Sequence, residues 1–118
     1  MSVKLYGLKN CDTCRKASQW LTKAGIDFEL ADIRQEGVAA KRVPEWLKSE
    51  SWETLLNRRS RSWRELTDTD RANIDADSAQ VLMLQNPTLI KRPVLEHANG
   101  LLVGFSAAQY KTTLAGAD

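Results

Sequence analysis

The first third of the chain alternates between strand-like and helix-like patterns of apolar residues. Residues 3–6 are β-prone and are followed by a glycine and polar residues, which predicts a strand that ends in a loop. Over residues 12–24 the apolar side chains recur at helical spacing. Ile26, Phe28 and Leu30 then alternate with other residues, which predicts a half-buried strand. A strand–helix–strand unit of this kind favours a right-handed crossover and a parallel strand pair.

The middle of the chain, about residues 38–86, carries helical patterns interrupted by turn signals. A short helix is expected over residues 41–48, with Pro44 in its first turn, where a missing N–H is tolerated. The residues of this helix that are expected to face inward are Val43, Trp46 and Leu47. This stretch therefore reads as one helical insertion within a single domain.

Two spacings in the same stretch resemble capping boxes, in which a side chain at the start of a helix and the residue three positions later satisfy backbone N–H groups. They are Ser62 with Glu65, and Asp77 with Gln80, and each predicts a helix start. The last helix of the insertion is expected to end near Asn86-Pro87. Its buried side is expected to consist of Val81, Leu82 and Leu84.

The end of the chain returns to strands. Two apolar runs flank Asn99-Gly100, which is a strong signal for a tight β-hairpin. Ser106 with Gln109 then predicts a last helix over residues 107–114. The complete order predicts an α/β fold of the thioredoxin-like (glutaredoxin-like) type. In it a β-α-β unit and a β-β-α unit form the core, and a helical insertion lies between the second and third strands.

Length and composition narrow the class of protein. A chain of 118 residues is enough for one domain. We expect a single domain over 1–118, with its core at about 1–35 and 88–115 and the insertion at about 38–87. The content of 42% hydrophobic and 27% charged residues is that of a globular protein. The small net charge of +2 argues against a nucleic-acid partner.

No apolar run approaches the ~20 residues that a membrane span needs, and the beginning of the chain lacks the apolar region of a signal peptide. We therefore expect a cytoplasmic protein without a membrane partner.

Cys11 and Cys14 form a Cys-x-x-Cys motif and are the only cysteines. Thiols are kept reduced in the cytosol, so the motif there indicates a metal site or redox chemistry. A structural zinc site takes four ligands, and His97 is the only histidine, so no metal is expected. The alternative, two ordinary buried residues, is disfavoured by the polar neighbours of the pair, which are Asn10, Asp12, Thr13, Arg15 and Lys16.

The predicted elements place the pair at the end of the first strand and the start of the first helix. Free N–H groups and the positive end of the helix dipole stabilise a thiolate there, and Arg15 adds a charge one turn into the helix. Cys11 is therefore the expected nucleophile, with Cys14 behind it as a resolving thiol.

Two segments resemble the YffB branch of the ArsC-type reductases. They are residues 6–17, Tyr-Gly-Leu-Lys-Asn-Cys-Asp-Thr-Cys-Arg-Lys-Ala, and residues 86–94, Asn-Pro-Thr-Leu-Ile-Lys-Arg-Pro-Val. The resemblance covers nearly the whole chain. It implies a glutaredoxin-like fold in a family that includes glutathione- and glutaredoxin-dependent arsenate reductases and the Spx transcription regulators.

The resemblance also implies roles for single residues. Cys11 matches the nucleophile, and Arg15 matches an arginine that helps to hold the thiolate. Cys14 stands where arsenate reductases usually have serine and where Spx has its second cysteine. Arg92 matches the arginine that binds the oxyanion or stabilises the covalent adduct, and Pro93 matches a cis-proline. The expected glutathione-binding residues are Asn10, Arg59, Arg92 and Pro93.

Three departures from the arsenate reductases bear on the substrate. Gly7, Gly104 and Asn57 stand where those enzymes have a histidine and two arginines, although Arg58, Arg59 and Arg61 lie close to Asn57 in the chain. An arsenate site needs several cationic donors. The resemblance therefore favours thiol chemistry with glutathione, whose two carboxylates would use Arg92 and the basic cluster at residues 58–61.

The resulting hypothesis is a glutathione-dependent thiol reductase in which the Cys11 thiolate attacks a disulfide or an oxyanion such as arsenate. Glutathione is its expected co-substrate and glutaredoxin a further partner, with no bound cofactor. An alternative is a Spx-like, redox-switched regulator that binds RNA polymerase. A third reading is a domain without activity that only binds thiol peptides.

Overall fold

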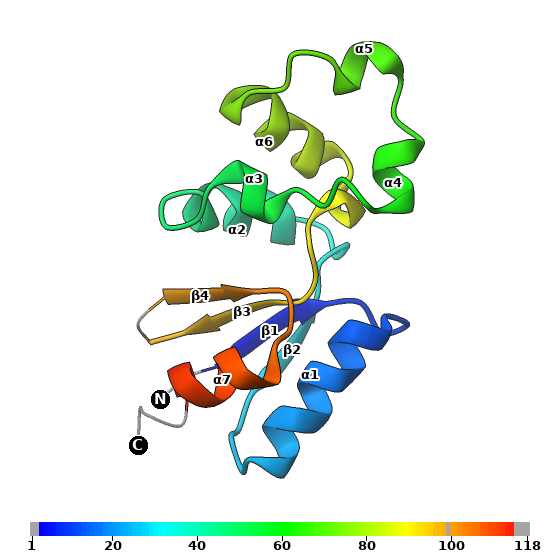
Figure 1. The fold of residues 1–118 in the computed structure, drawn as a ribbon. Helices are drawn as coiled ribbons and strands as arrows, with labels where there is room; N and C mark the ends of the chain where they lie inside the picture. The colour runs from blue at the N-terminus through cyan, green and yellow to red at the C-terminus, as the bar shows by residue number, and fades with distance from the viewer. Residues whose placement is uncertain (1–2, 99, 115–118) are drawn as a thin grey trace. The chain divides into compact units, whose positions relative to one another are not determined.

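The computed structural model describes residues 3–98 and 100–114 of the chain. They divide into two compact units, and Figure 1 shows the elements of both. One unit consists of the residues up to Asp32 together with those from Arg92 onwards, and the other of Ile33–Lys91. The candidate chemistry lies in the first, sheet-containing unit, whereas the second is helical. That both belong to a single domain stays a prediction.

The first unit is built on a four-stranded mixed sheet. Its strands are β1 (Lys4–Gly7), β2 (Glu29–Asp32), β3 (Val94–His97) and β4 (Gly100–Val103), in the order β2-β1-β3-β4. The pair β1–β2 is parallel, whereas β1–β3 and β3–β4 are antiparallel. This confirms the thioredoxin-like fold and the insertion between the second and third strands. The β3–β4 hairpin also forms as expected, although Asn99 of its predicted turn lies outside the described residues.

Helices α1 (Asp12–Lys23) and α7 (Ala107–Leu114) pack with the sheet into one hydrophobic cluster. Its buried members are Val3, Leu5, Ala17, Leu21, Leu95, Leu102, Tyr110 and Leu114. The ring of Tyr110 meets those of Trp20 and Phe105 edge-to-face, with centroids 5.6 and 4.9 Å apart. Its hydroxyl donates a hydrogen bond to the carbonyl of Gly104 at 3.3 Å, which satisfies the polar end of a buried side chain.

The prediction that Ile26, Phe28 and Leu30 form the inward side of a strand is wrong. The strand begins only at Glu29, and Leu30 is 64% exposed. Helix α1 ends in a Schellman motif, in which the N–H of Ile26 donates to the carbonyl of Leu21 at 3.0 Å. This motif turns Ile26 back onto the helix, so Ile26 and Phe28 pack against the core from the connection between α1 and β2.

The second unit contains the helices α2 (Val38–Trp46), α3 (Trp52–Leu55), α4 (Arg61–Arg64), α5 (Asp68–Arg71) and α6 (Ala76–Gln85), followed by the 3-10 turn η1 (Pro87–Leu89). Helix α2 packs against α6. A bridge between Leu56 and Ile90 ties the segment after α3 to the segment after η1. Across the described part of the chain, no helix is long and apolar enough to cross a membrane.

Helix α2 begins earlier than expected, so Pro44 lies inside it and not in its first turn. Gly37 precedes the helix with a left-handed backbone, at φ 84°, and lets the chain enter the helix at Val38. Val43 and Trp46 are buried as predicted, whereas Leu47 is only half-buried at the end of the helix.

The helix caps that correspond to both predicted capping boxes lie two residues before the predicted positions. The side chain that caps α4 is Ser60 and not Ser62, and the capping box of α6 is formed by Asp75 with Ser78 and not by Asp77. In each case the true cap has an extended backbone immediately before the helix, which lets its side chain reach the N–H three residues later. Polar residues two positions apart carry the same sequence signal.

The buried side of α6 is also different from the predicted one. Ala79, Leu82 and Met83 are buried, whereas Val81 is 51% exposed and Leu84 is half-buried. The buried three follow the i, i+3, i+4 spacing of a single helix face. Val81 lies off that face, because it is only two residues from Ala79 and Met83.

Candidate active site

The cysteine motif lies where β1 passes into α1. After β1 ends at Gly7, a short loop leads to Cys11, which is the N-cap residue of α1 with φ −110° and ψ 121°. The N–H of Arg15 donates to the Cys11 carbonyl at 3.0 Å and closes the first helical turn. The first N–H groups of a helix have no partner inside it and carry its positive dipole end. Cys11 therefore stands at a position that favours a thiolate.

The surroundings of Cys11 lower the pKa of its thiol. Partial burial alone would raise that pKa, because it disfavours the charged form. Hydrogen bonding by the backbone N–H and thiol of Cys14, and then hydrogen bonding and charge from Arg92, outweigh this effect. Cys11 is also half-exposed, so its thiolate is accessible to a substrate.

Cys14 has the opposite properties. It is 3% exposed, contrary to the expectation from its polar neighbours, because it lies on the same helix face as the buried Ala17 and Leu21. Burial raises the pKa of Cys14 to about 11, and its hydrogen bond with Cys11 and the charge of Cys11 act in the same direction. The Cys14 side chain thus remains a neutral thiol that donates to Cys11, and both cysteines are unbridged.

Strand pairing brings Arg92 and Pro93, which are far along the sequence, close to the cysteine motif. Tyr6 of β1 is paired with Val94 of β3, so the residues just before β3 lie beside the end of β1. The Arg92–Pro93 peptide bond is cis, as the resemblance implies. The Pro93 carbonyl accepts a hydrogen bond from the N–H of Gly104 at 2.8 Å, which links this segment to the end of β4.

The positive charge that lowers the pKa of Cys11 is that of Arg92. Arg15 forms an exposed ion pair with Asp12, and its side chain is 63% exposed. An exposed ion pair of this type is screened by water and contributes little. Arg15 follows Cys11 closely in sequence, but the more distant Arg92 has the stronger electrostatic effect on the thiol.

Gly7 has a packing role that sequence reasoning missed. A Cβ atom at this position would lie 2.5 Å from the Cys14 sulfur, 3.3 Å from the Cys14 Cβ and 3.8 Å from the Pro93 Cβ. The thiol of Cys14 thus occupies the space that a side chain at position 7 would need. A glycine at the end of a strand, a few residues before a Cys-x-x-Cys motif, is the only sequence signal of this contact.

The remaining predicted site residues are distributed over both units. Asn10 is exposed in the loop just before Cys11. Arg59 belongs to the helical unit, where its side chain is exposed. Its backbone N–H donates to Oδ1 of Asn57 at 3.0 Å. The neighbouring Arg58 lies over the rings of two tryptophans, Trp52 at 5.4 Å and Trp63 at 5.8 Å. A role of Asn10 and Arg59 in glutathione binding stays a prediction.

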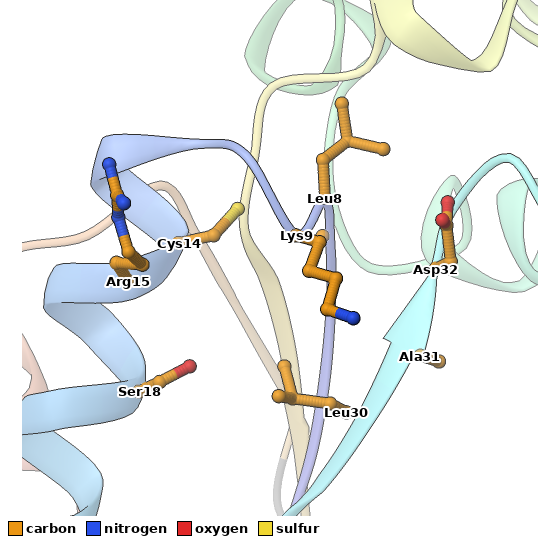
Figure 2. Close-up of a pocket in the computed structure, with 9 residues that line it drawn as sticks. Leu8, Lys9, Cys14, Arg15, Ser18, Leu30, Ala31 and Asp32 are labelled. Atoms are coloured by element: carbon orange, nitrogen blue, oxygen red, sulfur yellow. The ribbon is translucent and has the colours of Figure 1, made fainter.

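A cavity of about 290 Å³ opens beside the cysteine motif, between α1 and β2 (Figure 2). Its lining consists of Gly7, Leu8, Lys9, Cys14, Arg15, Ser18, Leu30, Ala31 and Asp32. No group of three or more metal-ligating side chains gathers within residues 3–98 and 100–114.

Two solved structures are similar to this chain over most of its length. An arsenate reductase (ArsC) related protein from Brucella melitensis is 48% identical, and the match covers 96% of this chain and 94% of that one with a TM-score of 0.77. A YffB protein is 37% identical, with coverage of 95% and 98% and a TM-score of 0.89.

Curated protein sequences are also similar to this chain. An uncharacterized protein of Haemophilus influenzae is 34% identical over 113 residues, which are 96% of this chain and 99% of the relative. The global transcriptional regulator Spx of Listeria innocua is 27% identical over 119 residues, at 95% and 86% coverage. The model of the ArsC family matches residues 6–113, which include both cysteines, Arg92 and the complete helical unit. The chain belongs to the ArsC family.

Proposed function

We propose that the protein is a glutathione-dependent thiol reductase with Cys11 as its nucleophile. The observation that carries the proposal is the contrast between the two thiols. The pKa of the accessible Cys11 is lowered, while the pKa of the buried Cys14 is raised to about 11. One thiol is thereby prepared to attack, and the other is kept protonated as a hydrogen-bond donor to it.

The reaction consists of thiol–disulfide exchanges. The Cys11 thiolate attacks one sulfur of a substrate disulfide, so that a mixed disulfide forms and the second substrate sulfur leaves as a thiolate. A glutathione thiolate then attacks the mixed disulfide at the Cys11 sulfur and releases the other half of the substrate as a thiol. A second glutathione restores Cys11 and leaves as glutathione disulfide. One disulfide is reduced and two glutathione molecules are oxidised, and the rates depend on the thiolate fraction of Cys11.

A disulfide fits this site better than arsenate. A multiply charged oxyanion needs several cationic donors. Arg92 acts on Cys11, but Arg15 is engaged with Asp12 at the surface. Gly7 and Gly104 offer no side chain, and the space beside Gly7 is taken by the Cys14 thiol. Glutathione, one of whose carboxylates would be bound by Arg92, is the proposed co-substrate, and glutaredoxin a further redox partner.

The test is intact-mass analysis of the reduced protein after exposure to oxidised glutathione at graded pH. We expect one glutathione on Cys11 at or below neutral pH. Cys11→Ser should abolish the adduct and all reductase activity, whereas Cys14→Ser should retain part of the glutathione-resolved turnover. Full activity of Cys11→Ser, or an adduct that forms only at alkaline pH, would refute the proposal.

A second candidate is a redox-switched regulator of the Spx kind. It is favoured by the contact between two unbridged thiols, together with the likeness to Spx along 95% of the chain. In this case oxidation would remove two hydrogens and form an internal disulfide without a glutathione adduct. A pull-down of the RNA polymerase α-subunit separates the two candidates, because only the regulator should retain it.

A further inference from the structure

We propose that the cavity between α1 and β2 binds an apolar side chain of a polypeptide substrate whose backbone pairs with the outer edge of β2. This inference rests on the proposed function and names its substrate class, which is a disulfide in a polypeptide. The site is called the Cys14 pocket below, and its lining includes Leu8, Lys9, Cys14, Ser18, Leu30 and Ala31.

The size of the Cys14 pocket suits one side chain. A cavity of about 150 Å³ holds a benzene molecule, and sites for complete small ligands start at about 300 Å³. At about 290 Å³ the pocket has room for one large aliphatic or aromatic group.

The chemistry of the lining points to an apolar occupant. Leu8, Leu30 and Ala31 contribute hydrocarbon surface, and Cys14 contributes a neutral thiol, since its pKa of about 11 keeps it uncharged. The lining also includes the charged residues Lys9, Arg15 and Asp32, of which Arg15 is paired with Asp12. In Figure 2 the side chains of Ser18 and Leu30 face each other from α1 and β2 across the pocket. Leu30 is 64% exposed, so the apolar surface is open to a partner.

The strand beside the pocket supplies a place for a polypeptide backbone. In the sheet order β2-β1-β3-β4, β2 is an edge strand with a partner strand on one side. The N–H of Glu29 donates to the carbonyl of Val3 at 3.0 Å, on the side of β1. Backbone groups alternate in direction along a strand, so the N–H and carbonyl of Leu30 point outward. An extended peptide can add to such an edge, with side chains entering pockets at alternate positions.

The Cys14 pocket lies between the edge of β2 and the nucleophile Cys11. Cys14 is part of the pocket lining, and its thiol hydrogen bonds to Cys11. An apolar residue close to the disulfide of an extended substrate would therefore enter the pocket while the disulfide reaches Cys11. The exchange step is the one given above, with the substrate sulfur leaving as a thiolate.

The experiment compares two model substrates that differ in one residue. Each is a short linear peptide joined through its cysteine to a nitrothiobenzoate group, and a phenylalanine near the cysteine of one peptide is replaced by asparagine in the other. The rate of release of the coloured thiolate by reduced protein gives the second-order rate constant. We expect the phenylalanine peptide to react about tenfold faster, since burying such a side chain is worth tenfold or more.

Leu30→Asp tests the pocket, and Val81→Asp is its matched control. Both positions are exposed apolar residues, and Val81 lies on α6 in the helical unit. Leu30→Asp should reduce the preference for the phenylalanine peptide below about threefold. Val81→Asp should leave the rates with both peptides unchanged. An equal rate for both peptides with the unaltered protein, or an unchanged preference in Leu30→Asp, would overturn the proposal.

A binding measurement keeps this inference separate from the proposed function. The Cys11→Ser protein, labelled with ¹⁵N, is titrated with the reduced phenylalanine peptide. Shifts of the amide signals of Leu30 and Ala31, absent with the asparagine peptide, would support the Cys14 pocket even if Cys11 proved unreactive. The absence of such shifts would refute the pocket even if Cys11 formed its glutathione adduct. The proposed function is tested separately, by the glutathione adduct on Cys11 and by the activity of Cys11→Ser.

Discussion

Gly7→Ala is the sharpest perturbation that the site offers, because a single methyl group enters an occupied space. The new Cβ would lie 2.5 Å from the Cys14 sulfur and 3.3 Å from the Cys14 Cβ. Nonbonded carbon atoms prefer about 3.5–4.0 Å, so the thiol must move by roughly 1 Å or more. Inserting a methyl group into a packed site typically costs about 1–3 kcal/mol. We expect a loss of about 2 kcal/mol in the free energy of unfolding.

The same displacement should change the chemistry of Cys11. A moved Cys14 thiol donates a weaker hydrogen bond to Cys11. Hydrogen bonds to charged groups contribute about 1.5–3 kcal/mol. Because this bond favours the thiolate, its weakening raises the pKa of Cys11. The pH profile of Cys11 alkylation should shift upward accordingly.

Urea unfolding under reducing conditions gives the stability change, and mass-resolved alkylation at graded pH gives the reactivity change. Cys14→Ala is the matched background, since it removes the sulfur with which the new methyl group collides. In that background Gly7→Ala should cost at least about 1 kcal/mol less, as expected for residues in contact. The steric reasoning would be refuted if Gly7→Ala changed the free energy of unfolding by less than about 0.5 kcal/mol in the original background. It would also be refuted if the loss in free energy of unfolding were equal in both backgrounds.

Four further substitutions test other parts of the structure. Arg92→Gln should raise the pKa of Cys11 and slow its alkylation at neutral pH, whereas Arg15→Gln should leave the alkylation profile in place; equal shifts would contradict the assignment of the charge. Ser60→Ala should lower the free energy of unfolding by about 1 kcal/mol, measured in urea, because it removes the cap of α4. Tyr110→Phe should cost about 1 kcal/mol by the same measurement, through the loss of a buried hydrogen bond.

Features that depend on neighbours in the sequence could be predicted well. Helix α1 starts at the predicted residue, and α7 has the predicted limits, because amphipathic spacing and caps act within a few residues. The hairpin of β3 and β4 was likewise predictable from a two-residue turn signal. The predicted position of Cys11 at the start of a helix is confirmed for the same local reason.

Features that depend on distant packing could not be predicted in this way. The exposure of Leu30 follows from its place on an edge strand, and alternation along β2 does not reveal which strands are its neighbours. The burial of Val43 and Trp46 was predictable, but the position of Pro44 within α2 was not, because packing can compensate for a lost helical hydrogen bond. Two serines two residues apart, Ser60 and Ser62, likewise predict a cap equally well.

By itself, the sequence determined that this protein has a thiol pair at the start of a helix in a thioredoxin-like fold. Both properties follow from short-range patterns. Only the tertiary structure decided which charge and which packing act on the pair. Arg92 reaches the cysteines through the pairing of β1 with β3, whose residues are far apart in the chain. Gly7 is close to Cys14 in sequence, but only the folded chain shows that the Cys14 thiol fills the space beside it. Hydrogen bonds and steric contacts act over a few ångströms, so proximity in space, and not in sequence, sets the properties of the two thiols.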